Sequence, residues 1–394
     1  MSWFFSSRKN TSGWLLVQVG SGSATLTLVC PGDNDPSSQQ ILWSHKEHTL
    51  LRADTSPERN LQAILTAIFN AVLVFNTFRG RGETQAAKID VKKIVVTVAA
   101  PWVYSVIKSA HYREAVPFEI TADILNDISE AANQKAVDVV HKHELLQVSD
   151  LSIITTKTLA TYGNGYKINA KQSGRVHNVE MIHLTSLVQK KLLTNLRDTF
   201  EQIFPNAKLV IRPLILTFYD AVNEGNLLGT EYTLIAITSE ATEVGVVHDA
   251  VLQNITNIPS GTRTLLRGVA EILKIPTEEA ALYMRDFRNQ TQKLSVSRTS
   301  KLEALAESYQ AELANALKSD LATPMISGKV VVYIDPVFSD YFNQLLITTL
   351  KNLQLPNVAI TKAWSICQTN QLCAAQLLVC VSLQAIKNES VSDD

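Results

Sequence analysis

The sequence predicts an α/β protein in which two similar domains surround a central cleft. Residues 14–29 and 231–256 share one plan: an apolar strand, a turn of small residues, a second strand and, further along, a capped helix. A unit that recurs at such long spacing indicates an internal duplication. The chain has 394 residues, which is too long for one simple core, so two or more domains are expected.

The bulk composition indicates an ordinary globular protein. Hydrophobic residues make up 46% of the chain and charged residues 19%, unlike the composition of disordered chains. The formal net charge is -1, whereas binding to a phosphate backbone requires a basic surface. The composition therefore gives no reason to expect nucleic acid as a partner.

The four cysteines fit a reducing cytoplasm. Cys367, Cys373 and Cys380 lie near the C-terminus, and Cys30 lies far from them. Their spacing matches neither a C-x-x-C motif nor a zinc ribbon. Cys380 lies within the apolar run QLLVCVSL, where a small buried hydrophobic residue is expected.

The sequence shows no membrane span or signal peptide. No stretch reaches the roughly 18 to 20 uninterrupted apolar residues of a spanning helix, and the start, MSWFFSSRKN, lacks the long apolar core of a signal peptide. The segment Trp3–Phe5, followed by Arg8 and Lys9, suits contact with a bilayer surface or a partner groove. A frayed terminus is the alternative.

Turn residues and apolar periodicity predict the elements in order. Strands are expected at 14–20, 23–30, 39–46 and 93–101. Between the last two, Ser56 caps a helix, Pro57 fits its first turn and Gly80 ends it. Later elements are a helix at 187–203, a strand running into a helix at 207–222, a polar helix at 297–322, and strands at 329–336, 355–362 and 376–386.

Residues 88–185 are expected to form a compact α+β insert. Its helix, 117–140, has Thr121 as a cap and Asp123 in the positive first turn. Three strand-like runs follow, at 151–162, 165–172 and 177–187, with glycine turns between them.

In this order of elements, the chain resembles the actin-like superfamily and within it the group of FtsA and PilM. SRKNTSGWLLVQVGSGSATLTLV is similar to the family's opening, FEITADILNDISEAANQ to the helix of its SHS2-type insert, and IPSGTRTLLRGVAEILKIPTEEA to the segment after its second phosphate loop. The resemblance implies ribonuclease H-like domains. It places subdomain I at 1–87, 186–225 and 326–394, the insert at 88–185, and subdomain II at 226–325.

The family's first phosphate loop corresponds to residues 18–23. Gly20 keeps the turn, and Ser21 and Ser23 offer hydroxyl groups. The family carboxylate that orders magnesium and water falls on Gln18, which supplies no charge.

The second and third loops depart further from the family. In the second, AITSEATE stands for Asp-Ile-Gly-Gly-Gly-Thr-Thr-Asp, so Thr238, Ser239 and Glu240 replace glycines, while Thr242 and Glu243 keep their character. Glycines let backbone N–H groups approach a phosphate, and a carboxylate beside it repels it. In the adenosine loop, YIDPVFSD places Asp335 and Pro336 where the family has glycines.

The resemblance thus implies a vestigial nucleotide cleft. Its residues are Gln18, Gly20, Ser21, Ser23, Thr238, Ser239, Thr242, Glu243, Gly261 and Asp335. Without the carboxylates, phosphoryl transfer has no metal site, so a pseudo-ATPase is expected, with no catalytic residue, no metal and no bound ATP or magnesium. One alternative is an ATP-binding, polymerising protein like FtsA. Another is a sugar-kinase-like enzyme, but this chain has no aspartate at the position that sugar-kinase catalysis requires.

Other polar groups favour structural roles. His141 and His143 face different sides of a helix, and His177 and His183 lie on strands without nearby ligands. Glu243 and Asp249 would form an acid pair without a nucleophile. SGTR, residues 260–263, would either bind an anion at a helix start or form a plain turn and cap.

The C-terminal end separates the two relatives. FtsA-type proteins carry a membrane-binding amphipathic helix there, whereas this chain shows a core strand and a short acidic tail, KNESVSDD. The resemblance therefore favours PilM: a non-catalytic cytoplasmic scaffold held at the inner face of the membrane by a short cytoplasmic peptide of a single-span protein. Self-association is a further expectation. By this analogy the resemblance implies that the chain acts in type IV pilus or related envelope machinery.

Overall fold

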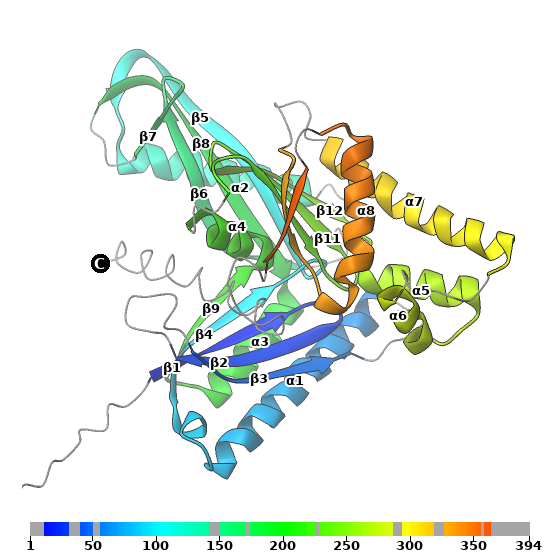
Figure 1. Ribbon diagram of the computed structural model, residues 1–394. Helices are drawn as coiled ribbons and strands as arrows, with labels where there is room; N and C mark the ends of the chain where they lie inside the picture. The colour runs from blue at the N-terminus through cyan, green and yellow to red at the C-terminus, as the bar shows by residue number, and fades with distance from the viewer. Residues whose placement is uncertain are drawn as a thin grey trace, which may run out of the picture.

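The computed structural model describes residues 12–30, 40–49, 56–141, 150–169, 174–224, 228–286, 294–318, 327–355 and 358–363. The predictions for Trp3–Phe5, for Cys367, Cys373 and Cys380, and for the strand at 376–386 lie outside these ranges. Within them the chain forms three sheets, two of five strands and one of four (Figure 1).

The first sheet has the order β3-β2-β1-β4-β9. Its strands are β1 (Ser12–Val19), β2 (Ser23–Cys30), β3 (Gln40–His48), β4 (Asp90–Val98) and β9 (Lys208–Pro213). β1 pairs antiparallel with β2 and parallel with β4. The near-continuous apolar runs of β1 and β4 are typical of strands that are covered on both faces.

Helices α1 (Pro57–Arg81) and α3 (Lys190–Ile203) contribute to the core of the first sheet. Ser56 caps α1, as predicted, by accepting a hydrogen bond from the Arg59 backbone N–H at 3.4 Å. The helix runs through the predicted stop, Gly80, and ends at Arg81, because Gly82 adopts the left-handed backbone (φ 60°) that caps the helix. A short 3-10 helix, η2 (Ala86–Lys88), follows.

The insert is a four-stranded sheet of order β5-β8-β6-β7 with helix α2 packed on it. Its elements are β5 (Val103–Glu119), α2 (Ala122–His141), β6 (Leu151–Gly163), β7 (Tyr166–Ile168) and β8 (Arg175–Gln189). Thr121 caps α2 as predicted, since its hydroxyl accepts from the Ile124 N–H at 3.3 Å. The insert rises beside the second sheet in Figure 1.

The second five-stranded sheet repeats the topology of the first, with the order β12-β11-β10-β13-β14. After α4 (Leu214–Glu224) come β10 (Tyr232–Ile237), β11 (Thr242–His248), β12 (Val251–Ile258), β13 (Lys329–Tyr333) and β14 (Ala359–Lys362). β10 pairs antiparallel with β11 and parallel with β13, as β1 does with β2 and β4. The predicted duplication is therefore confirmed.

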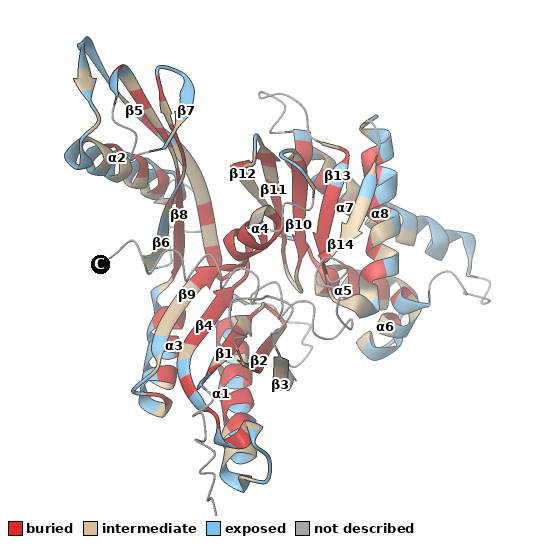
Figure 2. Ribbon diagram, turned by 60° about the vertical axis from the view of Figure 1, so that its left-hand side comes forward, coloured by how far each residue is buried: buried red, intermediate tan, exposed pale blue. Residues whose placement is uncertain are grey.

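The remaining elements cover this second sheet. They are α5 (Thr262–Leu273), α6 (Thr277–Arg285), α7 (Val296–Lys318), η5 (Pro336–Phe338) and α8 (Ser339–Asn352). Figure 2 shows buried strands in both sheets and helices whose outward faces are exposed.

Strand pairing differs from the predicted boundaries in two places. β4, assigned to the insert, is a central strand of the first sheet, and β13 and β14, assigned to subdomain I, belong to the second sheet. In each case a parallel partner decides the position: β1 for β4 and β10 for β13. Sheet membership of a parallel strand depends on contacts far along the chain, which local patterns do not encode.

Helix α1 is the one described helix that is long and apolar enough to span a membrane. It instead buries seven residues against the first sheet, among them Ile64, Ala71 and Phe75. Phe69 and Leu73 are exposed on its outer side. Its position is that of a core helix of the first domain.

Candidate functional site

The two predicted phosphate loops lie against each other. Each follows a central strand, residues 20–22 after β1 and residues 238–241 after β10. The backbone N–H of Glu240 donates to the Ser21 hydroxyl at 2.9 Å. A Cβ atom on Gly22 would lie 2.7 Å from the Ser239 Cβ, so Ser239 occupies the space beside this glycine. We call this contact, together with Arg263, the loop junction.

Arg263 joins the two domains at the loop junction. Its guanidinium extends from α5 and donates to the Gly22 carbonyl at 3.1 Å and to the Thr49 carbonyl and hydroxyl at 2.7 and 2.5 Å. Burial lowers the pKa of Arg263, an effect that Glu240 opposes. An arginine with three oxygen partners nevertheless remains a cation at neutral pH. The guanidinium therefore donates its hydrogen bonds to backbone and hydroxyl oxygens of this chain.

Glu240 does not point toward an empty phosphate site. Arg267 on α5 binds its carboxylate with both terminal nitrogens, at 2.8 and 2.6 Å. The hydrogen bond to Glu240 raises the pKa of Arg267. The bidentate pair fixes the second loop on its own domain, and the negative charge that was expected to face a polyphosphate is neutralised.

The first turn of α5 is also occupied. The N–H groups of Thr262 and Arg263 donate to the carbonyls of Thr238 and Ser239 at 2.9 and 2.8 Å. Two of the donors that an anion would need are therefore bound to the loop, which favours the turn-and-cap interpretation of SGTR. Gly261 permits this approach, because a Cβ there would lie 2.8 Å from the Ala241 nitrogen.

Gln18 and Asp335 link the two sheets beside the loop junction. The Gln18 amide on β1 donates to the Tyr333 hydroxyl on β13, and burial raises the pKa of Tyr333. Lys46 on β3 binds Asp335 at 2.8 Å. Burial opposes ionisation of Asp335, but Lys46 outweighs it and lowers the pKa of this carboxyl. The Gln18 amide thus acts as a hydrogen-bond donor between the two domains.

Thr242 and Glu243 are fully buried at the start of β11. The Thr242 hydroxyl donates to the Ser260 carbonyl at 2.8 Å and lies 3.0 Å from the Tyr309 hydroxyl. Glu243 reaches the first domain, where its carboxyl accepts the Ala100 N–H at 3.3 Å. Burial raises the pKa of Glu243 to about 7, and the hydrogen bond from Ala100 opposes this rise only in part.

Solved structures identify this architecture. The chain matches a structure of the PilM-PilN type IV pilus biogenesis complex with a TM-score of 0.61 and 10% sequence identity, covering 95% of this chain and 98% of that chain. The fold is actin-like and resembles that of PilM. No protein-family model and no curated protein sequence matches the chain.

Two further solved structures match this chain with lower TM-scores. The ethanolamine utilization protein EutJ from Carboxydothermus hydrogenoformans has a TM-score of 0.43 at 10% identity, with 94% of this chain and 89% of that chain covered. A Bacteroides thetaiotaomicron protein with an actin-like ATPase fold has a TM-score of 0.38 at 12% identity, with 88% and 99% covered.

The PilM-like fold brings together most of the predicted cleft residues. Ser21, Ser239 and Gly261 lie at the loop junction or directly behind it, and Gly20 accepts the Trp102 indole N–H at 3.0 Å through its carbonyl. Ser23 begins β2, opposite His48. The sequence reasoning missed the cross-domain roles of Arg263 and Thr49. SGTR was the one signal for Arg263, but nothing in the sequence points to Thr49.

The remaining candidates are not brought into one site. Glu243 and Asp249 are six residues apart along β11 and its turn, about 20 Å in an extended strand. His183 is buried with its Nδ1 3.3 Å from the Thr158 hydroxyl, and burial lowers its pKa. His177 is exposed. His143 and the side chain of His141 lie outside the described part of the chain.

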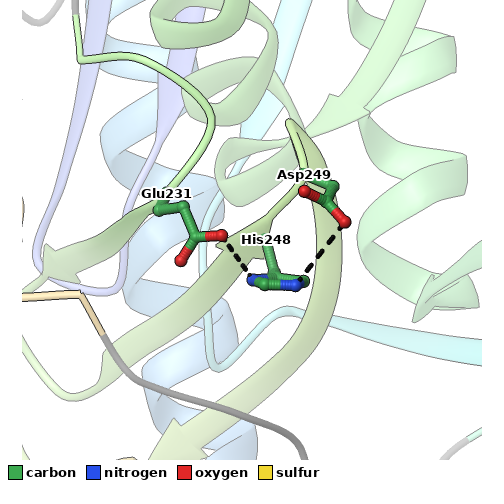
Figure 3. A group of neighbouring side chains, drawn as sticks. All are labelled: Glu231, His248 and Asp249. Atoms are coloured by element: carbon green, nitrogen blue, oxygen red, sulfur yellow. Dashed lines mark ion pairs between the residues drawn. The ribbon is translucent and has the colours of Figure 1, made fainter.

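One group of possible metal ligands lies at the far end of β11. Glu231, His248 and Asp249 place ligand atoms within 4.8 Å of one another. Figure 3 shows the imidazole between the two carboxylates: Nδ1 lies 2.7 Å from Glu231 and Nε2 lies 3.5 Å from Asp249. Because the carboxylates approach opposite ring nitrogens, the group forms two ion pairs when the imidazole is protonated and does not converge on one cation.

Proposed function

We propose that this protein is a non-catalytic, actin-like scaffold that links cytoplasmic and inner-membrane parts of a type IV pilus or related envelope machinery. It works without bound ATP or magnesium. It is cytoplasmic and reaches the inner face of the membrane by binding a short cytoplasmic peptide of a single-span membrane protein.

The observation that carries the proposal is the loop junction. A phosphate group between the two loops would have to displace the Ser21–Glu240 hydrogen bond and the three bonds of Arg263. Each hydrogen bond to a charged group contributes about 1.5 to 3 kcal/mol. The loops also lack the glycines of a phosphate cradle at Thr238 and Ser239. The arrangement supports a rigid two-domain body better than a nucleotide-driven machine.

The partner half of the proposal rests on the PilM-PilN match. That solved structure is a complex, and the likeness covers nearly all of both chains. At 10% identity the likeness is one of fold, so the partner and its peptide come to this chain by analogy. The insert, residues 103–189, is the region on which we place the peptide.

Calorimetry with ATP and magnesium tests the nucleotide half. We expect no heat of binding up to millimolar ATP, for the wild type and for an Arg285→Ala control, which changes an exposed ion pair with Asp286. Micromolar affinity would contradict the proposal and favour the ATP-binding, polymerising alternative.

Peptide binding tests the partner half. Synthetic peptides covering the cytoplasmic N-terminal tails of single-span inner-membrane proteins from the same cell are titrated against the full chain. Hydrogen exchange then locates the bound peptide. We expect one tail to bind and to protect amides within residues 103–189. Binding that protects only residues outside the insert would overturn this placement, and the absence of binding by every tail would overturn the partner assignment.

A further inference from the structure

Glu243 is a buried carboxyl at the contact between the two domains. Glu243 lies near the start of β11 in the second sheet and has no exposed surface. Its Oε2 accepts a hydrogen bond at 3.3 Å from the backbone N–H of Ala100, in the segment after β4. Its other oxygen, Oε1, has no hydrogen-bond partner among the residues that the structure describes. A carboxylate usually accepts several hydrogen bonds when buried, so this environment suits the neutral acid.

Among the residues that the structure describes, the groups that flank Glu243 carry no charge. Its neighbours across the sheet are Ala236 on β10 and Asn257 on β12. The facing segment, residues 99–102, reads AAPW, and β12 contains no ionisable residue. Tyr309 of α7 contacts the adjacent Thr242, and burial raises the pKa of Tyr309, so it stays neutral around pH 7.

The charged groups of the adjoining loop are already engaged. Glu240 is bound by Arg267, and Arg263 is bound by Gly22 and Thr49. Lys46 and Asp335 form their own pair. None of these cations offers a hydrogen bond to Glu243 among the described residues. A negative charge on Glu243 would therefore be buried with one N–H donor as its compensation, which is costly.

We propose that Glu243 makes the closed arrangement of the two domains depend on pH, because the neutral acid fits the contact with Ala100 and the carboxylate weakens it. Protonation is the one chemical event, and the proton exchanges with solvent when the domains separate. The device does not require that the protein bind a peptide or lack ATP, so it stands apart from the proposed function.

The direction of the effect follows from linkage. Burial raises the pKa of Glu243 from about 4.5 to about 7 in the folded protein. The folded state then binds more protons than the open or unfolded state between these values. The stabilisation is complete below pH 4.5, decreases as the pH rises, and is lost above pH 7. One titrating group changes the equilibrium by at most tenfold per pH unit.

Urea unfolding and hydrogen exchange between pH 5 and 8.5 test the proposal on the full chain. Glu243→Gln keeps the shape and removes the titration. We expect the free energy of unfolding of the wild type to decrease as the pH rises to 7. In the variant most of this decrease should be absent. Comparing the two proteins at each pH cancels intrinsic exchange rates, and the amides of residues 99–100 and 238–243 should lose protection with pH only in the wild type.

His48→Gln is the matched control, because burial and the positive charges of Lys46 and Arg263 lower the pKa of His48. Its contribution has the opposite sign and is lost as the pH falls below about 6.5. The carbon-13 resonance of the Glu243 carboxyl supplies a readout that needs no folded Gln variant. A midpoint near 7 is expected. A midpoint near 4.5, or equal pH profiles for wild type and Glu243→Gln, would overturn the proposal.

Discussion

The two strand–turn–strand units have the same topology, but their turns are built from different residues. The turn after β1 contains Gly20 and Gly22, whereas the turn after β10 contains Thr238, Ser239 and Glu240. The Ser239 side chain lies where a Cβ of Gly22 would be. The small residue on one side accommodates the larger one on the other. The loops of the two repeated units thus pack against each other as one complementary contact. The residues of one loop are explained only together with those of the other.

Gly261→Ala should break the second unit most severely. A Cβ at this position would lie 2.8 Å from both the Ala241 nitrogen and the Ser239 carbonyl carbon, and backbone atoms cannot move aside cheaply. We expect a loss of about 3 kcal/mol or more in the free energy of unfolding, measured by urea denaturation. Gly80→Ala in α1, which meets nothing within 4 Å, should instead stabilise the protein by up to about 1 kcal/mol. Equal effects at the two glycines would contradict this account.

Arg263→Ala should separate the two units without distorting either. The variant loses three hydrogen bonds from a partly buried cation, so we expect a loss of about 2 to 3 kcal/mol in the free energy of unfolding. Hydrogen exchange should speed up at residues 20–22 and 49. Arg285→Ala, with an exposed pair, should change stability by less than about 0.5 kcal/mol. A similar small change for Arg263→Ala would mean that the loops do not depend on this side chain.

Gly22→Ala and Ser239→Gly test the complementarity directly. Gly22→Ala forces the new Cβ onto the Ser239 side chain and should cost about 1 to 2 kcal/mol. In the Ser239→Gly background the same change should cost much less. A double-mutant cycle measures the coupling, expected at about 1 kcal/mol. Additive effects would show that the two residues do not share this space.

Lys46→Met should give the smallest effect. The Lys46–Asp335 pair is partly exposed, with 40% and 31% of the two side chains accessible, so we expect about 0.5 kcal/mol. Because the pKa of Asp335 is lowered, its contribution is present above the ordinary value near 3.9 and is lost as the pH falls through the lower, folded value. The difference between wild type and Lys46→Met should therefore shrink in acid and in high salt. A difference that grows in acid would contradict the pairing.

Local signals in the sequence predict much of the fold. Ser56 and Thr121 predict the starts of α1 and α2, and the repeated plan at 14–29 and 231–256 predicts the duplication. β5 was not predicted, because charged residues such as Arg113 and Glu114 interrupt its apolar pattern in the outer half. The positions of β4 and β13 depend on distant partner strands, which a local pattern does not specify.

The sequence predicts that the candidate site does not bind a nucleotide, but it does not predict the contacts that the structure shows there. From the family resemblance, Gln18 and the second loop are predicted to supply neither a magnesium ligand nor a phosphate cradle. The bonds from Arg263 to Thr49 and from Gln18 to Tyr333 join residues 214 and 315 positions apart. Such pairs become visible only when the two sheets are placed side by side.

Calorimetric titration of the wild-type protein with ATP and magnesium tests the central claim most directly. If the chain's own loop contacts occupy the place of a nucleotide, no binding should be detected up to millimolar ATP, and the unfolding transition should not shift with ATP. Micromolar binding, with a matching rise in stability, would contradict the account, because the loop junction would then have to open for a ligand that it is inferred to exclude.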